Sequence, residues 1–82
     1  MREGDRVTVV HDGGTTKTVA FVRDETNRKG DVEIWLRFSL DEPLPFSLRT
    51  GRASGARRHS LALWKIEAGD LEILREQYGG RL

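Results

Sequence analysis

The segment at residues 32–38 restricts the possible folds of this chain more than any other. Its sequence, VEIWLRF, alternates four apolar residues with a glutamate, a tryptophan and an arginine. A period of two is the spacing of side chains on a β-strand, whose successive residues point to opposite faces of a sheet. We therefore expect a strand with one buried face, and we expect Trp35 on the other face with Glu33 and Arg37.

Two more strands are expected before this segment. Residues 5–11, DRVTVVH, are rich in β-branched valine, and residues 17–25, KTVAFVRDE, follow the dipeptide Asp-Gly. Glycine adopts positive φ without steric cost, so Asp-Gly between apolar segments favours a β-hairpin. The polar segment TNRKGD at residues 26–31 predicts the next turn. The first half of the chain thus predicts three consecutive strands.

The pattern changes at residues 39–59, which contain both prolines of the chain. Proline has no N–H to donate to a ladder, so this segment is expected to be a loop or a sheet edge. Residues 46–50 could form a short strand there. The segment SLALWKI at residues 60–66 predicts the next core strand. A long basic loop is therefore expected between the third and fourth core strands.

The last segment before the C-terminus, LEILREQY, fits two structures. If the segment is a strand, its first and third residues, Leu71 and Ile73, lie on the same face. If it is a helix, Leu71, Leu74 and Tyr78 share one face, and Asp70 could cap its N-terminus. We favour a short strand at residues 71–74.

The chain has 82 residues, of which 37% are apolar and 33% charged, and it is expected to form one globular domain over residues 1–82. It has no cysteine, which excludes disulfides and thiolate metal sites and is compatible with a reducing cytoplasm. No apolar run approaches the roughly 18 residues of a membrane helix. The N-terminal residues MREGDRV lack the apolar region of a signal peptide. We expect a cytoplasmic protein without membrane contact.

The order of strands and turns resembles that of small SH3-like barrels. Four stretches carry the resemblance: EGDRVTVV at the start, VAFVRDE and VEIWLRF as the next two strands, and LALWKIEAGDLEIL at the end. The Gly-Asp-x-Val opening and the WLRF type of strand are similar to those of Tudor-like and KOW-like barrels. The glycine that usually begins the second strand of a KOW motif is missing, since that region reads TTKTV. The resemblance implies a mostly-β fold, a small five-stranded antiparallel SH3-like barrel, and a habit of binding without a named ligand.

The segment SLRTGRASGARRHS at residues 47–60 gathers positive charge on a chain whose net charge is only +1. It contains two glycines and no acidic residue, so its guanidinium groups could contact phosphates at close range. The alternative is a solvated surface loop whose arginines pair with acidic residues near the C-terminus, since charge runs are usually solvated. The predicted phosphate-binding residues are Arg49, Arg52, Arg57 and Arg58, and the acidic residues of the alternative are Glu67, Asp70, Glu72 and Glu76.

The two tryptophans, Trp35 and Trp64, are the other predicted contacts for nucleic acid. Trp35 is flanked by charged residues on its face of the strand, where an exposed ring can stack on a base or on a guanidinium group. Trp64 lies on the face opposite Leu61 and Leu63. The alternative is a structural role, with the long loop folded over Trp35. If the two rings are neighbours across a ladder, they form one aromatic patch.

Nothing in the sequence indicates catalysis. His11 and His59 are far apart and make no metal-ligand spacing. The adjacent carboxylates Asp24 and Glu25 point to opposite faces if they lie in a strand, so they make a poor acid–base pair. We expect no enzyme activity, no catalytic residue, no metal site and no cofactor.

The sequence therefore favours a non-enzymatic module, of bacterial or phage origin, that binds nucleic acid. Lys17, Arg28 and Lys29 would extend its basic face. The alternative is a protein-interaction module, such as a small inhibitor or an assembly subunit, that meets an acidic protein surface. The small net charge favours this alternative, because dedicated nucleic-acid domains are usually more basic. The chain is expected to be a monomer, or a homodimer paired through the edge at residues 43–50.

Overall fold

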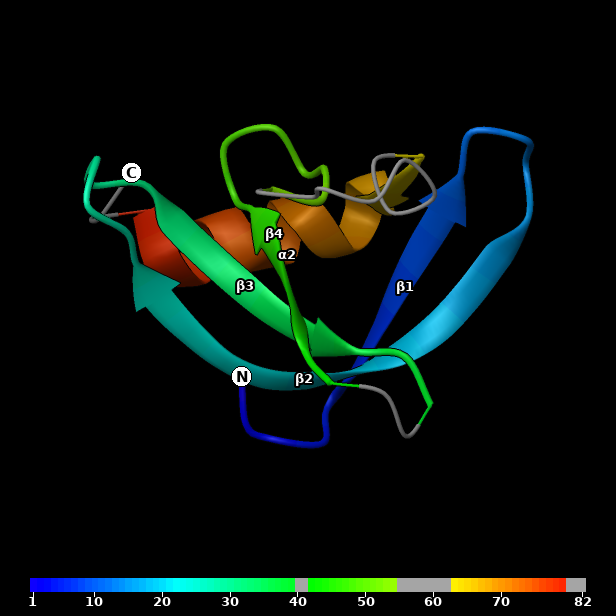
Figure 1. The fold of residues 1–82 in the computed structure, drawn as a ribbon, viewed down its shortest axis with the longest axis horizontal. Coiled ribbons are helices and arrows are strands. Elements are labelled where there is room, and N and C mark those ends of the chain that lie inside the picture. Colours follow the sequence, from blue (N-terminus) through cyan, green and yellow to red (C-terminus); the bar gives the residue numbers. More distant parts are fainter. Residues whose placement is uncertain (40–41, 55–62, 80–82) are drawn as a thin grey trace.

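The computed structural model describes residues 1–39, 42–54 and 63–79 of the chain (Figure 1). Strands β1 to β3 lie where the sequence predicted the first three strands, so the chain is mostly β as expected. The described residues form, in order, β1 (Arg6–His11), β2 (Thr16–Thr26), β3 (Val32–Arg37), β4 (Leu44–Ser47), β5 (Trp64–Ile66) and α2 (Ala68–Tyr78).

The strands form one antiparallel sheet in the order β4-β3-β2-β1-β5. The eleven-residue β2 pairs with β1 through its first half and with β3 through its second half. The register shifts between Phe21 and Arg23, and a bulge of this kind bends a strand and increases its twist. The bent β2 therefore belongs to both halves of the sheet, which curve around a shared core (Figure 1).

The segment that follows β4 closes the sheet on itself. After a turn at residues 48–51, Ala53 pairs with β4 and Arg52 pairs with β5. The N–H of Ile66 donates to the carbonyl oxygen of Gly51 at 2.7 Å. Five antiparallel strands thus form a nearly closed barrel, which confirms the predicted fold class and is compatible with an SH3-like barrel. Closure also leaves few unpaired strand edges.

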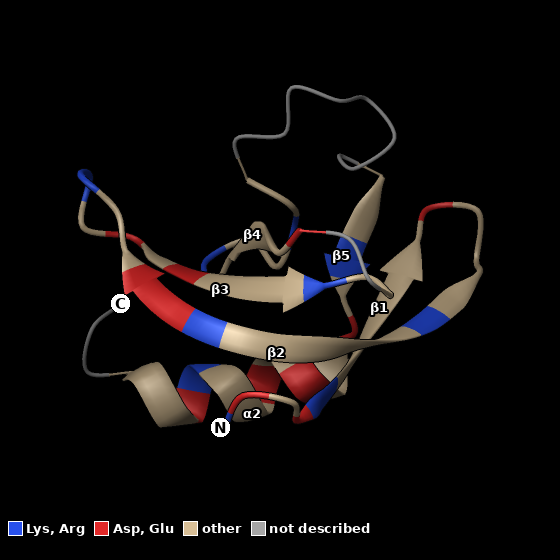
Figure 2. Cartoon of the chain, turned by 60° about the horizontal axis from the view of Figure 1, so that its bottom comes forward, with Lys and Arg blue, Asp and Glu red and all other residues tan. Residues whose placement is uncertain are grey.

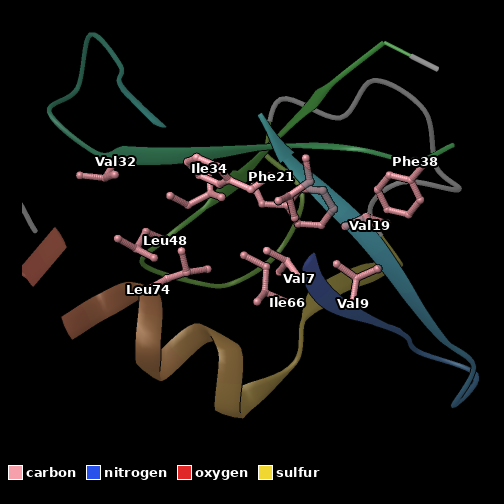
Figure 3. Close-up of a cluster of buried hydrophobic side chains, with 12 residues drawn as sticks. Val7, Val9, Val19, Phe21, Val32, Ile34, Phe38, Leu48, Ile66 and Leu74 are labelled. Carbon is pink, nitrogen blue, oxygen red and sulfur yellow. The ribbon is translucent and has the colours of Figure 1, made fainter. Parts of the chain in front are cut away.

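The apolar core lies between the curved sheet and α2, which packs beneath it (Figure 2). The alternation predicted for β3 is confirmed, because Val32, Ile34, Leu36 and Phe38 are all at most 8% exposed. Figure 3 shows apolar side chains of β1, β2, β3, β5 and α2 gathered in one cluster. The other buried apolar side chains among the described residues are those of Val7, Val9, Val19, Phe21, Phe46, Leu48, Ile66 and Leu74.

Residues 71–74, for which the sequence favoured a short strand, lie in α2, so that prediction was wrong. The helix begins after Glu67, whose carboxylate accepts hydrogen bonds from the N–H groups of Gly69 at 2.9 Å and Asp70 at 3.3 Å. A side-chain cap of this type satisfies backbone donors that have no partner in the first turn of a helix. The cap is therefore Glu67 and not Asp70.

Asp70 instead connects α2 to the barrel. Its Oδ2 accepts a hydrogen bond from the N–H of Thr8 at 2.7 Å, and the carbonyl oxygen of Thr8 accepts one from the N–H of Glu67 at 2.9 Å. Beyond the end of β5, β1 thus forms hydrogen bonds with the residues that begin α2. This fixes the helical face that turns toward the core, which carries the fully buried Leu74 and the partly buried Tyr78.

The proline-containing segment forms an edge strand. Pro45 lies in β4 opposite Trp35 of β3, and an edge strand tolerates a residue that lacks an N–H donor. The short strand that the sequence placed at residues 46–50 therefore begins and ends slightly earlier. In the sequence, the basic segment at residues 47–60 begins at the last residue of β4 and ends before β5.

Leu74→Ala should lower the free energy of unfolding by about 2–5 kcal/mol, the usual cost of removing a buried leucine side chain. The matched variant Ile73→Ala should change it by less than about 1 kcal/mol, because Ile73 is 54% exposed. Urea unfolding followed by circular dichroism measures both. The opposite order would mean that residues 71–74 form the strand and not the helix.

Gly51→Ala should lower the free energy of unfolding by about 2–4 kcal/mol, from left-handed strain and steric overlap together. Gly51 has φ of +79°, and a Cβ atom there would lie 2.9 Å from Cδ2 of Leu71. Gly30→Ala is the control, because Gly30 has φ of +86° but nothing within 4 Å of the added atom. Its loss should be about half as large, and equal losses in urea unfolding would contradict the contact with Leu71.

Candidate nucleic-acid interface

The structure describes four of the six residues that the sequence predicted as contacts for nucleic acid. Arg57 and Arg58 lie outside the described residues, as does the neighbouring His59. The other four occupy separate places on the barrel and do not form one continuous surface. These four are Arg49, Arg52, Trp35 and Trp64.

The most basic part of the chain begins and ends in two paired segments, which form a stem. Its stem joins residues 51–54 to β5, and includes a hydrogen bond from the N–H of Ala53 to the carbonyl oxygen of Trp64 at 3.4 Å. Residues 55–62, in which Arg57 and Arg58 occur, connect the two sides of the stem in the sequence. We call residues 51–66 the basic hairpin, because they contain no Asp or Glu and four basic residues, Arg52, Arg57, Arg58 and Lys65.

Arg52 and Lys65 are cross-strand partners in this stem, and both side chains are exposed. Nη1 of Arg52 lies 3.3 Å from Oδ1 of Asp12, and the two side chains are 46% and 42% exposed. An ion pair this exposed contributes about 0–1 kcal/mol, so a phosphate can replace the carboxylate at small cost. Lys65 forms no ion pair with a carboxylate in the part of the chain that the structure describes.

Arg49 lies at the other end of the barrel. It forms an ion pair with Asp31, and its side chain is 72% exposed. Asp31 follows the turn between β2 and β3, whereas Asp12 lies in the turn between β1 and β2 (Figure 1). A strand rises about 3.3 Å per residue, so β2 holds these two turns on the order of 30 Å apart. Arg49 and Arg52 are close in sequence, but their side chains reach different turns.

These ion pairs bear on the alternative prediction, in which the arginines pair with acidic residues near the C-terminus. The acidic partners that the structure shows for Arg49 and Arg52 are Asp31 and Asp12. Both come from turns in the first half of the chain. Ion pairs therefore neutralise Arg49 and Arg52, but their acidic partners lie far from them in the sequence.

Trp64 packs at the end of the barrel beside the β1–β2 turn. Its ring centroid lies 5.0 Å from that of His11 and 5.7 Å from that of Phe38, and both contacts are edge-to-face. Nζ of Lys17 lies 5.8 Å from the centroid of Phe38. The ring of Trp64 is half-buried and packs against the core. It thus contributes to stability and also to the surface beside the β1–β2 turn.

Trp35 lies on the outer face of β3, as the sequence predicted. The guanidinium carbon of Arg23 lies 4.3 Å from its ring centroid, which is a cation–π contact. Its Nε1 is buried, and none of the described residues provides an acceptor. Trp35 and Trp64 do not form one aromatic patch, because Trp35 lies outside the barrel wall and Trp64 packs on its core side.

Lys65 was not among the predicted contacts, although the sequence contains a signal for it. The stretch without acidic residues continues beyond His59 and includes Lys65. The three residues predicted to extend the basic face are divided between the two ends of the barrel. Lys17 lies near Trp64, whereas Arg28 and Lys29 lie in the β2–β3 turn.

Comparisons with protein-family models, with curated proteins and with solved structures found no match to this chain. Across residues 1–39, 42–54 and 63–79, no group of three or more His, Cys, Asp or Glu side chains is placed to hold a metal ion. No helix within those ranges has the length and apolar composition needed to cross a membrane.

Trp35→Phe should change the free energy of unfolding by less than about 1 kcal/mol. The smaller ring loses packing, but the change also removes a buried N–H without an acceptor, which costs about 1–3 kcal/mol. Thermal and urea unfolding measure the balance. A loss above about 2 kcal/mol would show that the indole N–H has a hydrogen-bond acceptor in solution.

Proposed function

We propose that the chain is a non-enzymatic module that binds single-stranded nucleic acid through the basic hairpin. One observation carries the proposal: the stem holds Arg52 and Lys65 side by side, at the base of a connection that contains Arg57 and Arg58. Phosphate groups spaced along a strand are suitable ligands for such a row of cations. The attraction is local, because the whole chain has a net charge of only +1.

Two features favour a single strand, bound with little sequence preference. The helix α2 carries exposed glutamates at Glu72 and Glu76 (Figure 2), so it is unsuited to the major groove of a duplex. The half-buried Trp64, beside the β1–β2 turn, offers part of its ring for stacking on an unpaired base. The KOW-like or Tudor-like character and the cytoplasmic location expected from the sequence belong to the same proposal.

A second candidate function is the docking of an acidic protein. It is favoured by the outer face of the barrel, where Arg23 already covers the ring of Trp35 and Pro45 lies opposite on β4. Tryptophan and arginine are the residues that most often dominate protein interfaces. In that case Trp35 and Arg23 would anchor the partner, and oligonucleotides would not compete with it.

Labelled single-stranded DNA, RNA and duplex DNA should be titrated at several salt concentrations, with fluorescence anisotropy as the readout. Arg52→Gln and Lys65→Gln should each weaken binding of single strands several-fold and reduce the slope of log K against log salt by about 1. Arg49→Gln is the matched control, because it removes the same charge from an exposed ion pair at the other end of the barrel. It should change the affinity by less than about twofold.

The pair Arg57→Ala and Arg58→Ala should weaken binding more than either stem variant and leave the melting temperature nearly unchanged. Absence of binding at low salt would contradict the proposal and leave the protein-docking function. Equal weakening by Arg49→Gln would show that overall charge, and not the basic hairpin, attracts the ligand.

A further inference from the structure

A pocket of about 260 Å³ lies at the end of the barrel where β2 turns into β3, away from the basic hairpin's ion pair with Asp12. Three parts of the chain meet there: the start of β3, the turn after β4 and the last turn of α2. Its lining residues are Asp31, Val32, Arg49 and Arg75.

Arg75 is held in place by the backbone of the neighbouring turn. Its Nε donates to the carbonyl oxygen of Leu48 at 3.0 Å, and its Nη2 donates to the carbonyl oxygen of Arg49. A guanidinium group has five N–H donors, so these two bonds leave three for a ligand. A side chain that is already fixed loses little rotamer freedom when it binds.

Arg49 supplies a second guanidinium group at the same pocket. Its side chain is 72% exposed, and its acidic partner Asp31 is 23% exposed. Two cationic groups therefore face one carboxylate among the lining residues. Arg28 and Lys29 lie in the adjacent turn and are exposed, so they add positive charge to this end of the barrel.

The nearest acidic residue along α2 is Glu76, which follows Arg75 in the sequence but does not line the pocket. The apolar wall comes from Val32 and from the methylene stems of the two arginines, since arginine side chains cover surface with their stems while the head group stays polar. The pocket therefore combines paired cationic donors with an apolar side. Its volume is below the roughly 300–1,000 Å³ of pockets for drug-sized ligands.

We propose that this pocket binds a small organic anion, with a carboxylate or phosphate head group held by Arg49 and Arg75 and a short apolar body against Val32. Guanidinium groups bind both kinds of head group through paired N–H···O bonds. Asp31 competes with the ligand for Arg49. This site is separate from the basic hairpin and does not depend on the nucleic-acid function.

Four probes separate the parts of this ligand: acetate, benzoate, inorganic phosphate and phenyl phosphate. They should be titrated into the ¹⁵N-labelled full chain at constant ionic strength, with amide and arginine Nε chemical shifts as the readout. Benzoate and phenyl phosphate should saturate and should bind at least about fivefold more tightly than acetate and inorganic phosphate, because burial of an apolar body adds to binding. The shifts should be largest at Val32, Arg49 and Arg75.

Arg49→Gln should weaken benzoate binding about tenfold, because it removes one of the two guanidinium groups. Asp31→Asn should strengthen binding several-fold, because it removes the competing carboxylate. Arg52→Gln is the matched control, as it removes an equal charge from an exposed ion pair at the other end of the barrel, and it should change binding by less than about twofold.

Arg75→Gln should abolish benzoate binding, and its spectrum reports whether α2 stays folded. If that variant unfolds, Arg49→Gln and Asp31→Asn still decide the question. Non-saturable shifts with all four probes, or equal weakening by Arg49→Gln and Arg52→Gln, would overturn the proposal. So would weaker binding by Asp31→Asn. Oligonucleotide binding that Arg52→Gln weakens several-fold and Arg49→Gln changes by less than about twofold shows that the two proposals are independent of each other.

Discussion

The barrel closes because the chain reverses direction at Gly51. This residue has φ of +79°, which an L-residue with a side chain adopts only at a cost. Its carbonyl oxygen accepts the N–H of Ile66, and the space that a Cβ atom would occupy is taken by Leu71 of α2. One glycine thus turns the chain back along β4, joins that segment to β5 and allows the helix to approach the barrel wall.

The same turn separates the two basic surfaces. Arg49 precedes Gly51 and pairs with Asp31, whereas Arg52 follows it and pairs with Asp12. Because β2 connects the turns that carry these two aspartates, the arginines are directed toward opposite ends of the barrel. A compact run of charge in the sequence therefore contributes to two surfaces with different surroundings, the stem that pairs Arg52 with Lys65 and a pocket beside a helix.

The strands β1 to β3 could be predicted because their signals are local in the sequence: alternation in β3, β-branched valine in β1 and the Asp-Gly turn before β2. The helix α2 could not be assigned in this way, because a short apolar run fits both a strand and a helix. The structure is decided by Glu67, which caps the first turn, and by the bond from Thr8 to Asp70, whose partners are 62 positions apart in the sequence. Contacts of that separation leave no periodic signal.

The candidate sites show a similar division. The concentration of arginine was visible in the sequence, but the acidic partners were not, since Asp31 and Asp12 lie 18 and 40 positions away from Arg49 and Arg52. Trp35 was correctly placed on the outer face from alternation. The contact of Arg23 with its ring was not foreseen, because it depends on the register that follows the bulge in β2.

The two ion pairs, Arg52 with Asp12 and Arg49 with Asp31, are both exposed, but their surroundings favour different ligands. At the basic hairpin, the exposed pair of Arg52 with Asp12 is worth about 0–1 kcal/mol, so a single anion in water gains little by displacing the carboxylate. A polyanion gains more, because several phosphates act together and release bound counterions. At the pocket, two backbone carbonyls already fix Arg75, and an apolar wall lies beside it. A single anion with an apolar body therefore gains both from the fixed guanidinium group and from the apolar contact. The chemistry of each proposed ligand thus follows from what surrounds the arginines and not from their number.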